Sequence, residues 1–277
     1  MSRNSYQSED PSTGCARWMR DKDAGSVRGG ATGATEDAVS RRRARSAGGV
    51  LRSGTSSIIV VKLGGAVARD AISYPLALAD QGHAVCIVHG AGPQISLEMA
   101  RRGIEVSFVH GRRVTTPEAL EAVREALARV NDELVQAVGE RAVGLMGDEI
   151  GLAAEQVPEL GLVGNPLPSS PAPVLEALAA GRIPVIAPLA GGPLNVNADE
   201  AAAMLAVGIE AERIHFVTDV PGLLIGDVVV ASIHAHEAEQ LLSSGKLHGG
   251  IIPKLRAAVH AARQGVIAEI GETAVIA

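Results

Sequence analysis

Residues 58–65, Ile58-Ile59-Val60-Val61-Lys62-Leu63-Gly64-Gly65, form an apolar, mostly β-branched run that ends in two glycines. Such a run predicts a strand buried on both faces, because helices cover both sides of a parallel sheet. The pattern recurs at Ala84–Val88, which is followed by glycines at positions 90 and 92. The two runs therefore predict an α/β fold in which glycine turns follow buried strands.

Helical and strand-like stretches alternate along the rest of the chain. Helices are expected at about 70–81, 94–102, 116–142, 198–207, 234–244 and 254–264, and further strands at 183–186, 214–218, 228–232 and 274–276. Pro117 suits the first position of the third helix. The alternation predicts a three-layer αβα sandwich with a mostly parallel central sheet.

The composition changes at Ser57. Residues 1–56 are rich in Gly, Ser, Arg and Ala without hydrophobic periodicity, so we expect a disordered extension before one domain at 57–277. This extension has 10 Lys and Arg against 6 Asp and Glu, a net charge of +4. Because the whole chain has a net charge of −6, the remaining residues carry −10. An acidic body argues against a nucleic-acid surface, and no apolar run is long enough to span a membrane.

Two minor features bear on partners and compartment. The run Arg41-Arg42-Arg43-Ala44-Arg45 is expected to be a solvated tail, with contact to nucleic acid or an anionic membrane as the alternative. Cys15 and Cys86 have no partner at metal-ligand spacing, so no metal site is expected. Cys86 lies within an apolar run, which predicts a buried thiol and a cytoplasmic location.

Polar and glycine residues follow four of the expected strands. They are Lys62–Gly65, His89–Pro93, Asn195–Asp199 and Asp219–Gly222. Ligands of such sheets bind at the carboxyl ends of the strands, so these sets are expected to converge. Glycine turns let backbone N–H groups approach an anion, although each turn alone also fits plain turn geometry. No Walker pattern occurs.

Two lysines and an aspartate give this edge its predicted chemistry. Lys62 ends a buried strand, where a charge is costly without an anionic partner, and Lys254 is expected to open a helix. Asp199 could hold both ammonium groups; an exposed lysine and a simple helix-start carboxylate are the alternatives. Phosphoryl transfer needs cations around a charge-dispersed transition state, and this set supplies them.

Five motifs occur in the order and approximate spacing of the amino acid kinase family, which the chain resembles over about residues 58–265. They are Val61-Lys62-Leu63-Gly64-Gly65, His89-Gly90-Ala91-Gly92-Pro93-Gln94-Ile95, Gly111-Arg112-Arg113-Val114-Thr115, Asn195-Val196-Asn197-Ala198-Asp199 and Gly250-Ile251-Ile252-Pro253-Lys254. The resemblance implies ATP-dependent phosphorylation of the γ-carboxylate of N-acetyl-L-glutamate in arginine biosynthesis. It also implies Mg²⁺ arriving with ATP, an acceptor lobe at 57–190 and a nucleotide lobe at 191–277.

The resemblance also implies residue roles. Lys62, Lys254 and Asp199 are expected to act on the transferring phosphoryl group. The acceptor is expected to contact Ala91, Gly92, Arg113 and Asn195, with Arg113 preferred over Arg112 as the carboxylate partner. The phosphates and the nucleotide are expected to contact Gly64, Gly65, Asp219, Gly222, Leu223 and Leu224.

Departures from the family pattern leave alternatives open. Ala91 stands where the family usually has glycine, so its φ must be negative and the acyl pocket narrower. A kinase of carrier-bound aminoadipate or glutamate is one alternative, because Arg101, Arg102, Arg112 and Arg113 form a basic cluster. A non-catalytic binding paralogue is another. Residues 1–56 lack an amphipathic helix, so we expect a homodimer without arginine inhibition.

Overall fold

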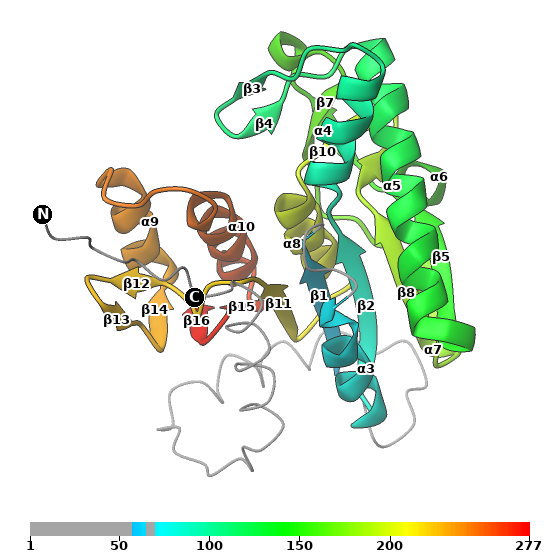
Figure 1. Ribbon diagram of the computed structural model, residues 1–277. Coiled ribbons are helices and arrows are strands. Elements are labelled where there is room, and N and C mark those ends of the chain that lie inside the picture. The colour runs from blue at the N-terminus through cyan, green and yellow to red at the C-terminus, as the bar shows by residue number, and fades with distance from the viewer. Residues whose placement is uncertain (1–56, 65–69) are drawn as a thin grey trace, which may run out of the picture.

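The computed structural model describes residues 57–64 and 70–277 (Figure 1). The expected extension at 1–56 and the glycine at position 65 lie outside the described residues. No helix in the described part of the chain is both long enough and apolar enough to cross a lipid bilayer.

An eight-stranded sheet forms the centre of the described structure, in the order β14-β16-β15-β11-β1-β2-β8-β5. Its strands are β14 (Ser232–His234), β16 (Thr273–Ile276), β15 (Ile267–Ile270), β11 (Arg213–Val217), β1 (Ile58–Leu63), β2 (Ala84–His89), β8 (Ile183–Ala187) and β5 (Ala142–Met146). Neighbouring strands are parallel except for β15 and β16. The predicted α/β fold with a mostly parallel sheet is confirmed.

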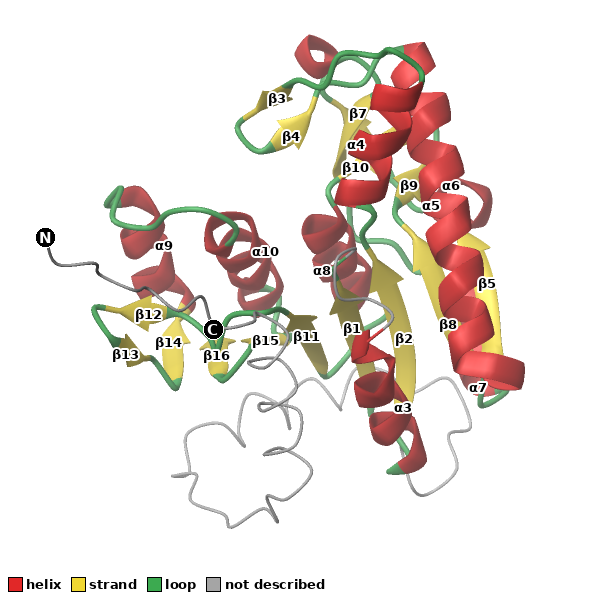
Figure 2. Cartoon of the chain, viewed as in Figure 1, coloured by secondary structure: helices red, strands yellow, loops and turns green. Residues whose placement is uncertain are grey.

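Helices cover both faces of this sheet (Figure 2). One face carries α3 (Ser73–Asp80, after the turn η1, Asp70–Ile72), α4 (Gly92–Arg101) and α5 (Pro117–Val138). The other carries α7 (Ala172–Ala179), α8 (Ala198–Gly208), α9 (Ala235–Ser243) and α10 (Ile251–Arg263). Strand alternation divides β1 between them: Ile59, Val61 and Leu63 pack toward α5, and Val60 packs toward α8.

Alanines fill much of the contact between α8 and α10. Ala202 and Ala206 on α8, and Ala258 and Ala261 on α10, are fully buried in one core cluster. Small side chains let two helices pack at short interaxial distance. This close packing carries the first turn of α8 toward the start of α10.

Smaller β elements extend beyond the main sheet. A four-stranded sheet has the order β6 (Ala154–Gln156), β7 (Val163–Pro166), β10 (Leu194–Val196) and β9 (Leu189–Ala190). Two hairpins pair β3 (Phe108–Val109) with β4 (Arg112–Arg113), and β12 (Leu224–Ile225) with β13 (Val228–Val229). Short helical turns are η2 (Gly139–Arg141), α6 (Gly147–Ile150) and η3 (Pro158–Leu160).

Several predicted boundaries are wrong. The long helix expected to reach position 142 ends at Val138, because Gly139 adopts φ +80°, and Ala142 already begins β5. The helix expected from Lys254 begins three residues earlier, at Ile251. The strand expected at 228–232 is two strands, β13 and β14, with positions 230 and 231 in neither.

Candidate active site

The four sets of residues that follow strands do converge. They line a cavity of about 400 Å³ at the carboxyl edge of the sheet, together with residues from α10 and the β3–β4 hairpin. The cavity lining includes Lys62, Gly64, Gly90, Ala91, Gly92, Pro93, Arg112, Arg113, Asn195, Asn197, Asp199, Asp219 and Lys254. The predicted convergence is confirmed for the described residues.

Lys62 and Asp199 form a buried ion pair at the centre of this edge. Strand alternation places Lys62 on the same face of β1 as Val60, the face that α8 covers. Its Nζ lies 2.7 Å from Asp199 Oδ1, and the two side chains are 7% and 8% exposed. Asn197 caps α8 by accepting hydrogen bonds from the backbone N–H groups of Asp199 and Glu200, which fixes the turn that carries the aspartate.

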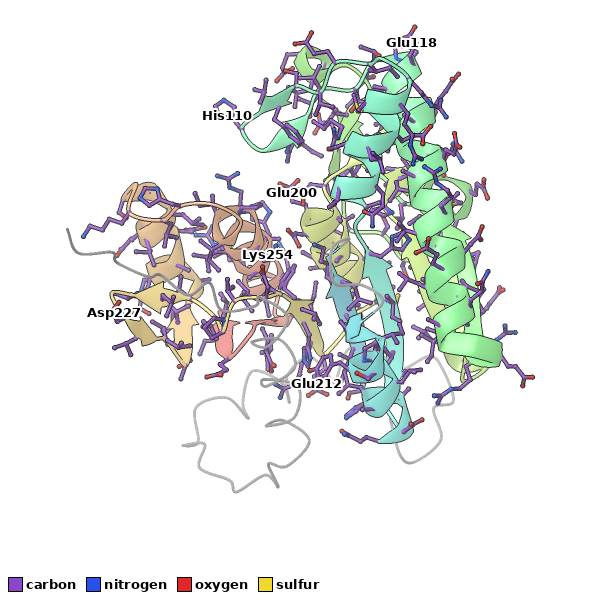
Figure 3. All side chains as sticks on the ribbon, in the orientation of Figure 1. His110, Glu118, Glu200, Glu212, Asp227 and Lys254 are labelled. Carbon is purple, nitrogen blue, oxygen red and sulfur yellow. The ribbon has the colours of Figure 1, made fainter. Side chains whose placement is uncertain are left out.

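Lys254 completes the set from the other side. It lies in the first turns of α10, and its Nζ is 3.6 Å from Asp199 Oδ2 (Figure 3). Burial opposes ionisation of Asp199, but the two ammonium groups outweigh it and hold the pKa of that carboxyl below its usual range. Burial lowers the pKa of Lys254, although the Asp199 carboxylate opposes that shift. The carboxylate of Asp199 therefore holds the ammonium groups of both Lys62 and Lys254 close to it.

The turn after β2 presents backbone to the cavity. Ala91 has φ −144°, so its methyl group is accommodated without strain, as the sequence required. An added Cβ at Gly92 would meet no atom within 4 Å, which shows open space beside the turn. Gly92 begins α4, whose N-terminal N–H groups favour an anion.

His89 is held beneath this turn as a neutral ring. Asn131 Nδ2 donates to Val185 O at 2.9 Å and to His89 Nε2 at 3.1 Å, so His89 Nδ1 carries the proton and faces Gly90 O at 3.5 Å. Burial, helped by the nearby Lys62 charge, lowers the pKa of His89 to about 4. His89 is therefore a strand-end histidine whose ring nitrogens both have partners, and the contact with Asn131 was not predicted from the sequence.

Arg113 is buried beside the cavity rather than exposed on the hairpin. Its guanidinium donates to Ser96 Oγ at 2.9 Å and to Gly92 O at 3.3 Å, and its Cζ lies 4.7 Å from the centre of the Phe108 ring. Burial lowers its pKa, but a guanidinium remains charged in proteins. A planar cation in this position suits a carboxylate.

The other arginines of the predicted basic cluster are paired with carboxylates. Arg102 Nε contacts Glu98 at 2.9 Å, and Arg101 lies 3.8 Å from the same side chain. Arg112 contacts Glu200 at 2.5 Å and also donates to Asn165. Of Arg112 and Arg113, only Arg113 lacks a carboxylate partner among the described residues, which favours it as the ligand-binding arginine.

Asn195 reaches the cavity from β10. Its Nδ2 donates to Thr115 Oγ1 at 3.0 Å, and Thr115 Oγ1 in turn donates to Arg113 O. These two hydrogen bonds link the side-chain amide of Asn195 on β10 to the backbone of Arg113 on β4. Sequence reasoning assigned Asn195 but missed Thr115, a buried hydroxyl whose only sequence signal is its place two residues after Arg113.

A second cavity of about 510 Å³ adjoins the first and shares Thr218, Asp219 and Lys254 with it. Its lining includes the predicted nucleotide residues Asp219, Gly222, Leu223 and Leu224, together with Lys246, Leu247 and His248. The side chain of Leu223 is fully buried in the core, and its backbone N–H donates to Thr273 Oγ1. Gly222 has φ +156°, and an added Cβ would lie 2.6 Å from that oxygen.

The described residues of the cavities offer no cluster of ligands for a resident metal ion. No group of three His, Cys, Asp or Glu side chains within 57–64 and 70–277 is arranged to hold one. Cations that accompany a nucleotide instead take oxygens from its phosphates.

The sequence matches one family model over most of its length. Residues 57–270 match the model described as "Amino acid kinase family". The chain belongs to the amino acid kinase family. Relatives within this family include the acetylglutamate kinase of Rubrobacter xylanophilus, 42% identical over 222 residues that cover 76% of this chain and 87% of that protein. The acetylglutamate kinase of Nocardioides sp. is 41% identical, with 76% and 75% covered.

Solved structures agree on the amino acid kinase fold. The protein smu.665 of Streptococcus mutans UA159 is 28% identical, with a TM-score of 0.69, and the match covers 79% of this chain and 98% of that one. Carbamate kinase of Giardia lamblia bound to citric acid is 14% identical, with a TM-score of 0.60 and 81% and 99% covered. At that identity, the second likeness speaks to the fold alone.

Proposed function

We propose that this chain transfers the γ-phosphoryl group of ATP to the γ-carboxylate of N-acetyl-L-glutamate. The observation that carries the proposal is the buried set of Lys62, Asp199 and Lys254, which lines the first cavity, with Lys254 also lining the second. Relatives named acetylglutamate kinase, about 40% identical over three quarters of the chain, support the choice of acceptor.

Lys62, Lys254 and Asp199 each have a separate role in the in-line transfer of the phosphoryl group. Lys62 meets the phosphoryl oxygens from the acceptor side and Lys254 from the nucleotide side, where negative charge develops. Asp199 orients both ammonium groups and is not the group that transfers a proton, since its pKa is lowered. Mg²⁺ arriving with ATP would offset negative charge on the phosphates.

The acceptor is held at its other end. Arg113 pairs with the α-carboxylate, while Asn195 and the backbone of Ala91 and Gly92 hold the acyl-amino portion. Gly64 and the glycine after it donate to the phosphates, and Asp219, Gly222, Leu223 and Leu224 surround the nucleotide. The carboxylate partners of Arg101, Arg102 and Arg112 weaken the case for an acidic carrier protein as the acceptor.

The test is a substrate panel with the purified full chain, ATP and Mg²⁺. ADP release is followed by a coupled assay, and the acyl phosphate is trapped as its hydroxamate. We expect turnover with N-acetyl-L-glutamate and little with aspartate, carbamate or carrier-bound aminoadipate. Absence of turnover with millimolar N-acetyl-L-glutamate would overturn the proposal, and binding without ADP release would identify a non-catalytic paralogue.

Assembly and location complete the proposal. We infer a cytoplasmic homodimer that arginine does not inhibit, consistent with a biosynthetic kinase that draws on cytoplasmic ATP. Light scattering of the purified chain tests the dimer, and a hexamer would contradict it. Inhibition by micromolar arginine in the same coupled assay would contradict the second part.

A further inference from the structure

An ion pair ties the two ends of the acceptor cavity together. Arg112 Nη2 lies 2.5 Å from Glu200 Oε2, and the two side chains are 24% and 13% exposed. Arg112 is on β4, directly before Arg113, and Glu200 is in the first turn of α8, directly after Asp199. The pair therefore joins the neighbours of the proposed carboxylate anchor and of the residue that orients both lysines.

The hairpin that carries Arg112 depends on such contacts for its position. Within the described residues, β3 and β4 pair only with each other, around a turn at His110 and Gly111 that has φ +50° and +80°. An isolated two-stranded hairpin is marginally stable. Arg113 ties it to Gly92 and Ser96 of α4, and Arg112 ties it to Glu200 of α8.

We propose that the Arg112–Glu200 pair sets the length of the dicarboxylate that the site phosphorylates, so that N-acetylglutamate is favoured over acceptors one methylene shorter or longer. The inference rests on the proposed function. The α-carboxylate is fixed at Arg113 and the reacting carboxylate must reach Lys62 and Asp199, so the span between β4 and α8 has to match the side chain. A misplacement of about 1 Å at a reacting centre can cost on the order of 100-fold in rate.

Asn165 limits how the pair can move. Its side-chain oxygen accepts a hydrogen bond from Arg112 Nη1, so the guanidinium bridges β7 and α8 at once. β7 is hydrogen-bonded to β10, the strand of Asn195. The arginine is thus held from two directions that both belong to the walls of the cavity.

The test compares acceptors of different length in neutralised variants. The variants are Arg112→Gln, Glu200→Gln and their double mutant, and the acceptors are N-acetylaspartate, N-acetylglutamate and N-acetyl-α-aminoadipate. We expect the kcat/KM preference for N-acetylglutamate to fall about 10-fold in each single variant, as for a partly buried pair. The double variant should be no worse than either single, and Arg112→Lys should recover most of the preference.

A matched control removes an arginine of another ion pair. Arg141 contacts Asp80 at 2.8 Å, away from the cavity, and Arg141→Gln should leave the preference unchanged. Unchanged preference in Arg112→Gln and Glu200→Gln, or additive losses in the double variant, would overturn the inference. Should Arg112→Gln fail to fold, Glu200→Gln, which keeps the arginine, decides in the same way.

Failure of the inference and failure of the proposed function are separable. If wild type does not phosphorylate N-acetylglutamate at all, the proposed function is wrong. If wild type does so and the variants keep its preference among the three acceptors, the function stands and the inference alone is wrong.

Discussion

Replacing Asp199 with asparagine removes the charge that holds two lysines together. Its oxygens lie 2.7 Å from Lys62 Nζ and 3.6 Å from Lys254 Nζ. At an effective dielectric constant of about 20, these contacts correspond to attractions of about 6 and about 5 kcal/mol before the cost of desolvation. Without the carboxylate, the two ammonium groups face each other in a buried site, and the pKa of Lys254 falls further.

The expected result is a pH-dependent loss of catalysis. In Asp199→Asn, kcat should fall at least about 100-fold at neutral pH, since the lysines are displaced and Lys254 is deprotonated more readily. Activity should recover partly as the pH is lowered, because protonation restores the cation. Steady-state kinetics from pH 6 to 9 measures both effects.

Asp148 offers a control of equal burial. Its side chain is 8% exposed, as that of Asp199 is, and it is paired with Arg124 outside the cavity. Asp148→Asn should lower the melting temperature without changing the shape of the pH–kcat profile. Near-wild-type kcat in Asp199→Asn, or a loss with no recovery at lower pH, would refute the reasoning.

Three further predictions concern the surroundings of this group. Because burial lowers the pKa of Lys254, this residue loses its proton at a lower pH than an ordinary lysine, whose pKa is about 10.4. The kcat of wild type should therefore begin to decline at a pH below that value. In a pH–rate profile, Lys254→Arg should remove this alkaline decline. Asn131→Leu leaves His89 without its donor, so KM for the acceptor should rise about 3- to 10-fold with a smaller change in KM for ATP; equal changes would contradict a role in the turn. Gly222→Ala places a Cβ 2.6 Å from Thr273 Oγ1, so nucleotide affinity by calorimetry should fall while binding of the acceptor persists.

Much of the fold follows from local patterns in the sequence. Buried parallel strands need mostly apolar runs, and β1, β2 and β8 have them. The rule that ligands meet the carboxyl ends of parallel strands then brought Lys62 and Asp199 together before any distance was known. Lys254, expected to open a helix, was added to this set as a second cation, and the structure places it 3.6 Å from Asp199.

The errors arose where local signals are weak or act over long distances. Ala142 was assigned to the end of the long helix, because alanine favours helices; pairing with β8 instead makes Ala142–Met146 a strand, which was not predicted. Asn131 looks like a solvent-facing residue of a helix, yet it meets His89 from 42 positions away. The Arg112–Glu200 pair spans 88 positions, and no single-sequence pattern announces it.

The alanines between α8 and α10 connect the packing of the core with the geometry of the site. Ala202, Ala206, Ala258 and Ala261 do not line either cavity, yet their size sets how near the two helices come and hence how Lys254 meets Asp199. A larger side chain at this seam would push the helices apart, since protein interiors have little free volume to absorb it. Side chains that line neither cavity can therefore change the distance between Lys254 and Asp199, and with it the chemistry of the site.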